Sequence, residues 1–317
     1  MAELFLTDNC NLKCVSCACW REQTRGELTT DEWRDVLDQL ADLRFVKLNF
    51  TGGEALVRRD AGEVISYARS LGFQNLHLNT NGLQLNRRRL AEVLGAGVRS
   101  FNISVDGANA SVHDAIRGRS GSFDAAIGAV RLLAEHRDRY GLNVRMNFTV
   151  LAGNVEEIPA VARLARDLEV TLSLNLGTDR TFLFRHEDVG QLLDVDGDAL
   201  RASLRELERM VREDPRGLPS RATLRYIPSH FGLAADSFIP CAESQLKLMI
   251  RSTGEIGGCW GHDSTMNVRD HSIRSIVDSA EYRAEHERLF RKDCVRCGSN
   301  YALNVKVDRV TRVPYGR

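Results

Sequence analysis

Three cysteines near the N-terminus have the residue type and spacing of metal ligands. Cys10, Cys14 and Cys17 lie in the run C-N-L-K-C-V-S-C, directly after the apolar segment 3–7. A four-iron cluster takes one thiolate ligand on each iron. The three cysteines therefore predict such a cluster, with its fourth iron open to a ligand that is not protein. The alternatives are a zinc knuckle or three buried small side chains. Zinc sites, however, usually contain paired CxxC knuckles, and no partner pair lies close by.

A second group of four cysteines lies in the C-terminal part of the chain. Residues 246–250 predict a strand, 252–255 a hairpin turn and 279–290 an amphipathic helix. The hairpin would bring two cysteines close together, and a CxxC pair after the helix would complete a set of four thiolates. Such a closed set of four thiolates suits zinc or an iron–sulfur cluster. The four residues are Cys241, Cys259, Cys294 and Cys297.

The composition narrows the class of protein. Lys and Arg together number 43, as do Asp and Glu, so no excess of positive charge predicts nucleic-acid binding. No apolar run reaches the roughly 20 residues that span a bilayer, and the start lacks a basic stretch followed by an apolar one. We therefore expect a cytoplasmic protein without a nucleic-acid or membrane partner. In that reducing compartment, its eight cysteines are expected to be metal ligands or catalytic thiols.

The first half of the chain predicts the elements that position these groups. From residue 4 to about residue 177, short apolar runs alternate with amphipathic segments, the pattern of a parallel sheet with crossover helices. Six such units predict an α/β fold, a partial (β/α)6 barrel with its chemistry at the carboxyl ends of the strands. The expected strands are 3–7, 45–50, 75–79, 100–105, 143–150 and 171–176, and the expected helices are 30–41, 60–71, 87–94, 123–136 and 155–168.

The chain changes character after the sixth expected strand. Four of its six prolines lie between residues 215 and 240, after a charged helix expected at 198–213. We therefore expect three parts: the barrel, a linker with a helix, and a small α+β domain that holds the second group of cysteines. Their expected bounds are 1–178, 179–240 and 241–317.

Glycines and polar residues follow the expected strands where each strand leaves the core. The second strand runs into T-G-G-E, where Gly52 and Gly53 let the backbone approach a ligand and Glu54 directs a carboxylate at it. The third strand ends in N-T-N-G. The fourth, N-I-S-V-D-G, places Ser104 and Asp106 on one face, because side chains alternate along a strand. Taken singly, each residue could also be an ordinary cap or an exposed turn.

These motifs together resemble the radical S-adenosylmethionine (radical SAM) superfamily, whose members carry CxxxCxxC near the N-terminus and G-G-E after the second strand. The resemblance implies that Cys10, Cys14 and Cys17 hold a [4Fe-4S] cluster whose open iron binds S-adenosylmethionine (SAM). Ser16 departs from the pattern, since an aromatic residue is usual at that position. For Arg117 a structural salt bridge is an equal alternative. The implied SAM contacts are Gly52, Gly53, Glu54, Asn79, Ser104, Asp106, Arg117 and Asn147.

The resemblance extends into the second half of the chain. The run H-D-A-I-R-G, followed by G-S-F-D, is similar to members with a C-terminal SPASM or twitch extension. The four later cysteines resemble the shorter twitch form, which implies one auxiliary [4Fe-4S] cluster. Cys19 is then left over, either as a buried thiol or as a hydrogen donor to a substrate radical, as in radical SAM epimerases. Asp179 and Arg180 would lie over the barrel mouth near a substrate, or in a solvated loop.

The resemblance also implies a reaction. One electron from flavodoxin or ferredoxin cleaves SAM to methionine and a 5′-deoxyadenosyl radical, which takes hydrogen from an unactivated carbon. The substrate radical is then oxidised or receives hydrogen on its opposite face, so the protein would be an oxidoreductase or an epimerase. Twitch-bearing relatives of both kinds act on aminocyclitols and sugars in antibiotic biosynthesis.

The expected substrate follows from the start of the chain. Met1 lies two residues before the first expected strand, so we expect no N-terminal domain for recognising a leader peptide. This favours a small polar substrate, sugar-like or aminocyclitol-like, over a peptide. The alternative is a maturase that modifies a ribosomal peptide or protein. The alternative of another class is a non-catalytic iron–sulfur or zinc-binding redox or scaffold protein.

Overall fold

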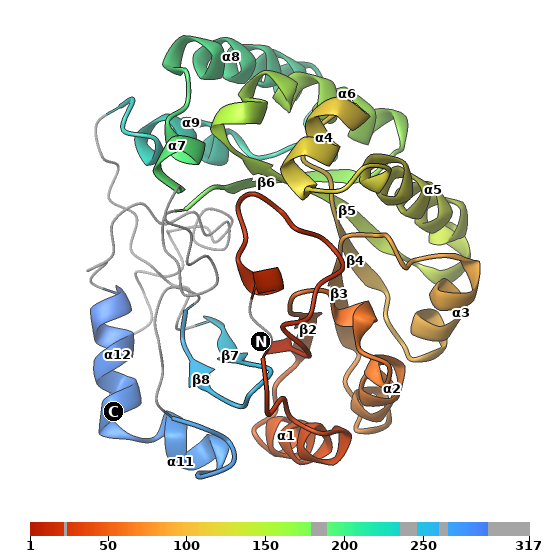
Figure 1. Cartoon of the computed structure of the whole chain (residues 1–317), viewed down its shortest axis with the longest axis vertical. Coiled ribbons are helices and arrows are strands. Elements are labelled where there is room, and N and C mark those ends of the chain that lie inside the picture. Colours follow the sequence, from red (N-terminus) through yellow and green to blue (C-terminus); the bar gives the residue numbers. More distant parts are fainter. Residues whose placement is uncertain (22–23, 179–188, 235–245, 260–265, 291–317) are drawn as a thin grey trace.

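The computed structural model describes residues 1–21, 24–178, 189–234, 246–259 and 266–290. Within them, one sheet has the strand order β6-β5-β4-β3-β2-β1-β7-β8 (Figure 1). The first six strands pair in parallel and in chain order, which confirms the predicted α/β fold. They are β1 (Ala2–Phe5), β2 (Lys47–Thr51), β3 (Asn75–Thr80), β4 (Ser100–Ser104), β5 (Asn143–Val150) and β6 (Thr171–Leu176).

Helices connect these strands and surround the sheet on its outer side (Figure 1). Five of them lie where the sequence predicted helices: α1 (Thr30–Asp42), α2 (Ala61–Ser70), α3 (Arg87–Gly95), α5 (Ser122–Tyr140) and α6 (Ile158–Asp167). Three short 3-10 turns accompany them: η1 (Cys19–Arg21), η2 (Ala55–Val57) and η3 (Ala152–Glu157). No helix in the described part of the chain is long and apolar enough to cross a bilayer.

A helix that the sequence did not predict, α4 (Ala110–Arg117), lies between β4 and α5. Asn109 caps its start, because the Asn109 side chain accepts from Val112 N, and Gly118 ends it in the left-handed conformation with a φ of 65°. The helix is only eight residues long, so its apolar period is too short to recognise in the sequence. It joins the end of β4 to the rest of the barrel.

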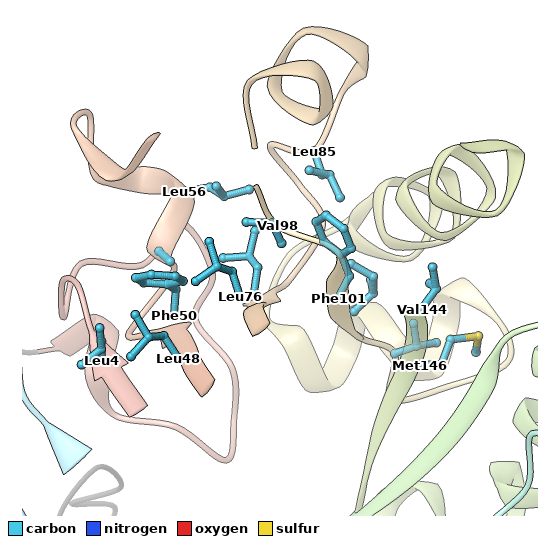
Figure 2. Packing of buried hydrophobic residues seen from close by; sticks show 14 of the residues in the cluster. Leu4, Leu48, Phe50, Leu56, Leu76, Leu85, Val98, Phe101, Val144 and Met146 are labelled. Carbon is cyan, nitrogen blue, oxygen red and sulfur yellow. The ribbon is translucent and has the colours of Figure 1, made fainter. Parts of the chain in front are cut away.

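The two faces of the sheet differ in polarity. Leu4, Phe50, Leu76, Phe101 and Met146 point toward the helices and form a continuous buried core (Figure 2). The alternate positions carry polar side chains, and the register pairs them across the strands. These pairs are Glu3 with Asn49, Asn49 with His77, His77 with Ser100, Asn79 with Asn102, and Ser104 with Asn147. The inner face of the barrel is therefore polar at these positions.

The segment predicted as a linker packs on the barrel through α7 (Val189–Leu193), α8 (Gly197–Glu213) and α9 (Arg221–His230). Leu193 joins Ile116 and Leu151 in one buried apolar cluster. The ring of His230 lies with Nε2 2.7 Å from the Gly177 carbonyl oxygen, just after β6. Because these contacts are buried, the described part of this segment belongs to the same compact body as the barrel.

The predicted hairpin is present, and it continues the barrel sheet. Strand β7 (Leu248–Ile250) pairs antiparallel with β8 (Ile256–Gly257) and parallel with β1. Beside β7, Lys247 Nζ lies 2.8 Å from Glu3 Oε2, and both side chains are 4% exposed. Asn49 Nδ2 donates to the other Glu3 oxygen at 2.9 Å. A buried ion pair thus connects the hairpin to the first barrel strand. Two helices follow, α11 (Ile273–Val277) and α12 (Ala280–Phe290).

Candidate active site

The cysteine loop starts where β1 ends, at the carboxyl edge of the sheet. Leu6 N donates to Thr51 O at 3.0 Å, so the chain leaves β1 alongside the end of β2. Cys14 is buried, whereas Cys10 and Cys17 are partly exposed, and all three are free thiols. The loop therefore lies where a barrel of this kind carries its chemistry.

Two glycines of T-G-G-E let this loop lie directly against the end of β2. Gly53 N donates to Thr7 O at 2.7 Å. A Cβ on Gly53 would lie 2.4 Å from the Asp8 carbonyl oxygen, and one on Gly52, whose φ is +140°, would lie 2.2 Å from that of Thr7. The sequence predicted that these glycines admit a ligand. In the structure they admit the backbone of the cysteine loop itself, a close approach that only glycine allows.

Replacing Gly53 by Ala is expected to displace the cysteine loop, because the new methyl group would meet two backbone oxygens, those of Asp8 and Asn9. We expect a loss of about 1–3 kcal/mol in the free energy of unfolding and a lower iron content after reconstitution. Urea unfolding and iron analysis measure the two effects. Gly128→Ala is the control, since nothing lies within 4 Å of a Cβ there and the position is helical. If both variants load iron equally, the close approach does not hold the loop.

Glu54 connects the end of β2 to the end of β3 through hydrogen bonds. Its side chain is 2% exposed, and its carboxylate accepts from Thr80 Oγ1 at 2.8 Å, Asn81 N at 2.7 Å and Leu56 N at 3.1 Å. Burial raises the pKa of Glu54 against these hydrogen bonds, which favour the charged form. Asn81 Nδ2 also donates to Asn11 Oδ1 at 2.7 Å, which connects both strand ends to the cysteine loop. Thr80 and Asn11 were not singled out from the sequence, in which the polar strand end N-T-N-G was the available signal.

Asp106 and Arg117 form a buried pair beside the cysteine loop. Both carboxylate oxygens of Asp106 have protein partners: Oδ1 accepts from Thr149 N at 2.8 Å, and Oδ2 lies 2.7 Å from Arg117 Nη2. The salt bridge considered for Arg117 is therefore present. Arg117 Nη1 lies 3.8 Å from Cys14 Sγ, so the guanidinium also reaches a predicted cluster ligand. This contact was not apparent from the sequence, because α4 was not predicted.

The other predicted SAM contacts lie on the polar inner face. Asn79 Oδ1 is 3.2 Å from Nε2 of His77, and burial lowers the pKa of His77 to about 3, so this ring is neutral. Ser104 and Asn147 are register partners on β4 and β5 and are partly exposed. Asn102 Oδ1 is buried and has no hydrogen-bond partner among the described residues. The face thus presents polar groups that a bound ligand can use.

Cys19 lies next to the cysteine loop in an apolar environment. It is 8% exposed and clusters with Phe5 and Met249, with Cys17 packed against them. A hydrogen bond between the two thiols lowers the pKa of Cys17 and raises that of Cys19. Burial raises the pKa of Cys10 to about 12. This environment corresponds to the buried thiol that was one of the two interpretations of Cys19.

The remaining predicted site residues are mostly outside the described residues. Of the second group of cysteines, only Cys259 is described; it follows β8 and is partly exposed. The auxiliary cluster and the substrate contacts therefore stay predictions. The five predicted residues outside the described ranges are Asp179, Arg180, Cys241, Cys294 and Cys297.

The described residues fit a [4Fe-4S] cluster with SAM. Such a cluster takes one thiolate on each iron, so its ligands stand at separate corners, and three free thiols on one loop match three irons. Within the described ranges, no group of three or more His, Cys, Asp or Glu side chains can hold a single metal ion as it stands. Two buried polar atoms without a hydrogen-bond partner in this part of the chain, Asn102 Oδ1 and Arg117 Nε, would suit a polar ligand.

The family of the chain follows from comparison with known proteins. The model of the Radical SAM superfamily matches residues 4–183, more than half of the chain. The chain therefore belongs to the radical SAM superfamily, and its cofactors are a [4Fe-4S] cluster and SAM.

Curated relatives include a heme synthase, a peptide cyclase and a maturase. The AdoMet-dependent heme synthase of Methanosarcina barkeri is 36% identical over 165 residues, which are 51% of this chain and 46% of the synthase. The PqqA peptide cyclase of Bradyrhizobium diazoefficiens is 26% identical over 277 residues, 86% of this chain and 69% of the cyclase. The mycofactocin maturase MftC of Mycolicibacterium smegmatis is 33% identical over 171 residues, 53% of this chain and 42% of the maturase. The chain thus spans less than half the length of the synthase and of the maturase.

Solved structures share the fold. Streptococcus suis SuiB bound to SAM has a TM-score of 0.69 at 15% identity, covering 89% of this chain and 66% of SuiB. Native anSMEcpe with bound AdoMet has a TM-score of 0.68 at 15% identity, covering 96% of this chain and 88% of that one. BtrN in complex with AdoMet and 2-DOIA has a TM-score of 0.52 at 14% identity, covering 95% and 96%. These likenesses confirm the partial barrel.

Proposed function

We propose that this radical SAM enzyme modifies a peptide or protein substrate. When bound, the cluster and SAM supply a carbon radical that can take hydrogen from an unactivated position. The observation that carries the chemistry is the cysteine loop, fixed at the carboxyl edge between the G-G-E segment and Arg117. An electron from flavodoxin or ferredoxin would start the reaction.

The protein's own residues would position SAM on the inner face. Arg117 carries a permanent positive charge that suits the carboxylate of SAM. Asp106 would act through Arg117, since both of its oxygens already have protein partners. Glu54 is likewise occupied by three donors, so it would hold the strand ends and leave the contact with SAM to neighbouring backbone. Further polar groups facing the ligand would come from Gly52, Gly53, Asn79, Ser104 and Asn147.

The comparisons favour a peptide over the small polar substrate expected from the sequence. One relative, whose match covers 86% of this chain, is a peptide cyclase, and another is a maturase. SuiB, which has also been solved with its precursor peptide SuiA, shares the fold more closely than BtrN, solved with 2-DOIA. We therefore propose the alternative interpretation, a maturase, as the main one. Oxidation or epimerisation of a sugar or aminocyclitol becomes the second candidate.

An auxiliary cluster is part of the proposal. Cys259 follows β8, in a hairpin that extends the barrel sheet. With Cys241, Cys294 and Cys297, it would ligate a second [4Fe-4S] cluster in a twitch-like region comprising residues 241–317. That cluster could accept an electron from a substrate radical. Iron and sulfide analysis of Cys259→Ala tests this proposal, because one cluster of two should be lost.

The substrate class is tested by parallel reactions with the two candidate substrates. The reconstituted protein is incubated without oxygen with SAM and dithionite, and with peptides encoded by short reading frames beside its gene. Parallel reactions contain 2-deoxy-scyllo-inosamine instead. We expect 5′-deoxyadenosine formation to rise with a peptide, and the peptide mass to fall by the hydrogen atoms removed. Turnover of the aminocyclitol without any peptide change would overturn the proposed substrate class.

A further inference from the structure

A backbone hydrogen bond connects the last turn of α4 to the cysteine loop. Val15 N donates to Ile116 O at 2.8 Å. Directly after the helix, a Cβ on Gly118 would lie 2.2 Å from the carbonyl oxygen of Lys13. Glycine at this position therefore permits the helix end and the loop to touch. Arg117, between these two contacts, starts from a backbone position fixed relative to the three cysteines.

The direction of the Arg117 side chain is fixed as well. Asp106 Oδ2 lies 2.7 Å from Arg117 Nη2, with side-chain exposures of 2% for Asp106 and 13% for Arg117. Asp106 is itself held by Thr149 N, which donates to its other oxygen at 2.8 Å. The remaining Arg117 amino group, Nη1, lies 3.8 Å from Cys14 Sγ. Because Nη1 and Nη2 belong to one rigid, planar guanidinium, the contact of Nη2 with Asp106 restricts where Nη1 can lie.

We propose that Arg117 is a positioning residue that raises the reduction potential of the N-terminal cluster by donating a hydrogen bond to the Cys14 thiolate. This inference rests on the proposed function, which places the cluster on Cys14. Reduction adds negative charge to the cluster, and hydrogen bonds to its sulfur ligands favour the more negative form. The effect precedes SAM binding, so it is separate from any contact between Arg117 and SAM.

A second arginine that contacts the same loop provides a matched control. Arg119 Nη1 donates to the Asn11 carbonyl oxygen at 3.2 Å, at an exposed position. Arg119 therefore has the same charge and contacts the same loop, but it donates to a carbonyl oxygen and not to a ligating sulfur. An exposed charge is also screened by solvent and salt. Replacing Arg119 should leave the cluster potential unchanged.

The test is a redox titration of the reconstituted full chain without SAM. Electron paramagnetic resonance of each sample measures how much of the cluster is reduced. SAM is then added to each sample, and the signal that changes is assigned to the N-terminal cluster. Arg117→Gln is expected to lower the potential by about 59 mV, which corresponds to a tenfold change in a one-electron equilibrium. Arg117→Lys keeps the charge but not the two-point geometry, so a smaller drop is expected. Arg119→Gln should match the parent.

The outcomes separate this inference from the proposed function. If Arg117→Gln loads iron and its potential equals that of Arg119→Gln, Arg117 does not act on the cluster and the inference is wrong. If Arg117→Gln fails to load iron, the potential of Arg117→Lys is compared with that of Arg119→Gln instead. Equal potentials again show that the inference is wrong. If the parent protein shows no signal that responds to SAM, the proposed function fails and this inference fails with it.

Discussion

Cys14→Ala is expected to abolish the formation of 5′-deoxyadenosine from SAM. Cys14 is the most buried of the three loop cysteines and the one in contact with Arg117. Without its thiolate, one iron of the N-terminal cluster loses its protein ligand, and an incomplete cluster cannot pass an electron to SAM. The measurement is chromatography of anaerobic reactions with SAM and dithionite. We expect the yield to fall to that of reactions without protein.

Ser16→Ala is the matched control for this prediction. It also removes one heavy atom from the same loop, and it leaves all thiols in place. We expect it to retain SAM cleavage and the iron content of the parent protein. Undiminished cleavage by Cys14→Ala would contradict the assignment of the loop as the cluster site. Equal loss in both variants would show that the loop tolerates no change, and would leave the ligand assignment to the iron analysis.

Lys247→Met is expected to lower the free energy of unfolding more than Gly53→Ala or Arg163→Met does. It removes the cation that lies 2.8 Å from the buried Glu3 carboxylate, between β1 and the hairpin. Breaking a buried ion pair on one side costs about 3–5 kcal/mol. Urea unfolding measures the change, provided that the slope of the transition stays the same. The double change Glu3→Gln with Lys247→Met should recover most of the loss, since no buried charge is then left alone and the side chain at position 3 can still accept from Asn49.

A surface ion pair serves as the comparison. Arg163 contacts Glu206 between α6 and α8, with side-chain exposures of 55% and 37%. Arg163→Met should change the free energy of unfolding by only about 0–1 kcal/mol, because solvent screens exposed pairs. Equal effects of Arg163→Met and Lys247→Met would show that burial does not strengthen the Glu3–Lys247 pair.

Much of the barrel could be predicted because its strands and helices follow strong local patterns. The bounds of β5 and β6 agree with the sequence at both ends, since their alternation is unbroken and turns flank them. Helix α4 was missed because eight residues hold too few apolar repeats. The pairing of β7 with β1 was also missed. It joins residues 246 positions apart, such as Ala2 and Leu248, and no local pattern reports such a contact.

The site was predictable in residue type and less so in geometry. Cys14 and Glu54 could be singled out because their motifs are compact in sequence. Their partners could not: Arg117 reaches Cys14 only through the turn of α4, and Glu54 meets Asn81 only through the register of β2 and β3. The roles of Gly52 and Gly53 also depend on a loop that returns across the strand end. These relations arise from packing between segments distant in the chain.

The interior position of β1 in the sheet has a consequence for how the protein would acquire its iron. The strand is hydrogen-bonded to β2 on one side and β7 on the other, and its residues are buried. Its amide protons should thus exchange with deuterated solvent only when the whole chain unfolds, later than those at the short outer strand β8. The anchor of the cysteine loop would then already be rigid in the iron-free protein. Iron and sulfide would then enter a barrel that is already folded. Cluster assembly would require no folding of β1.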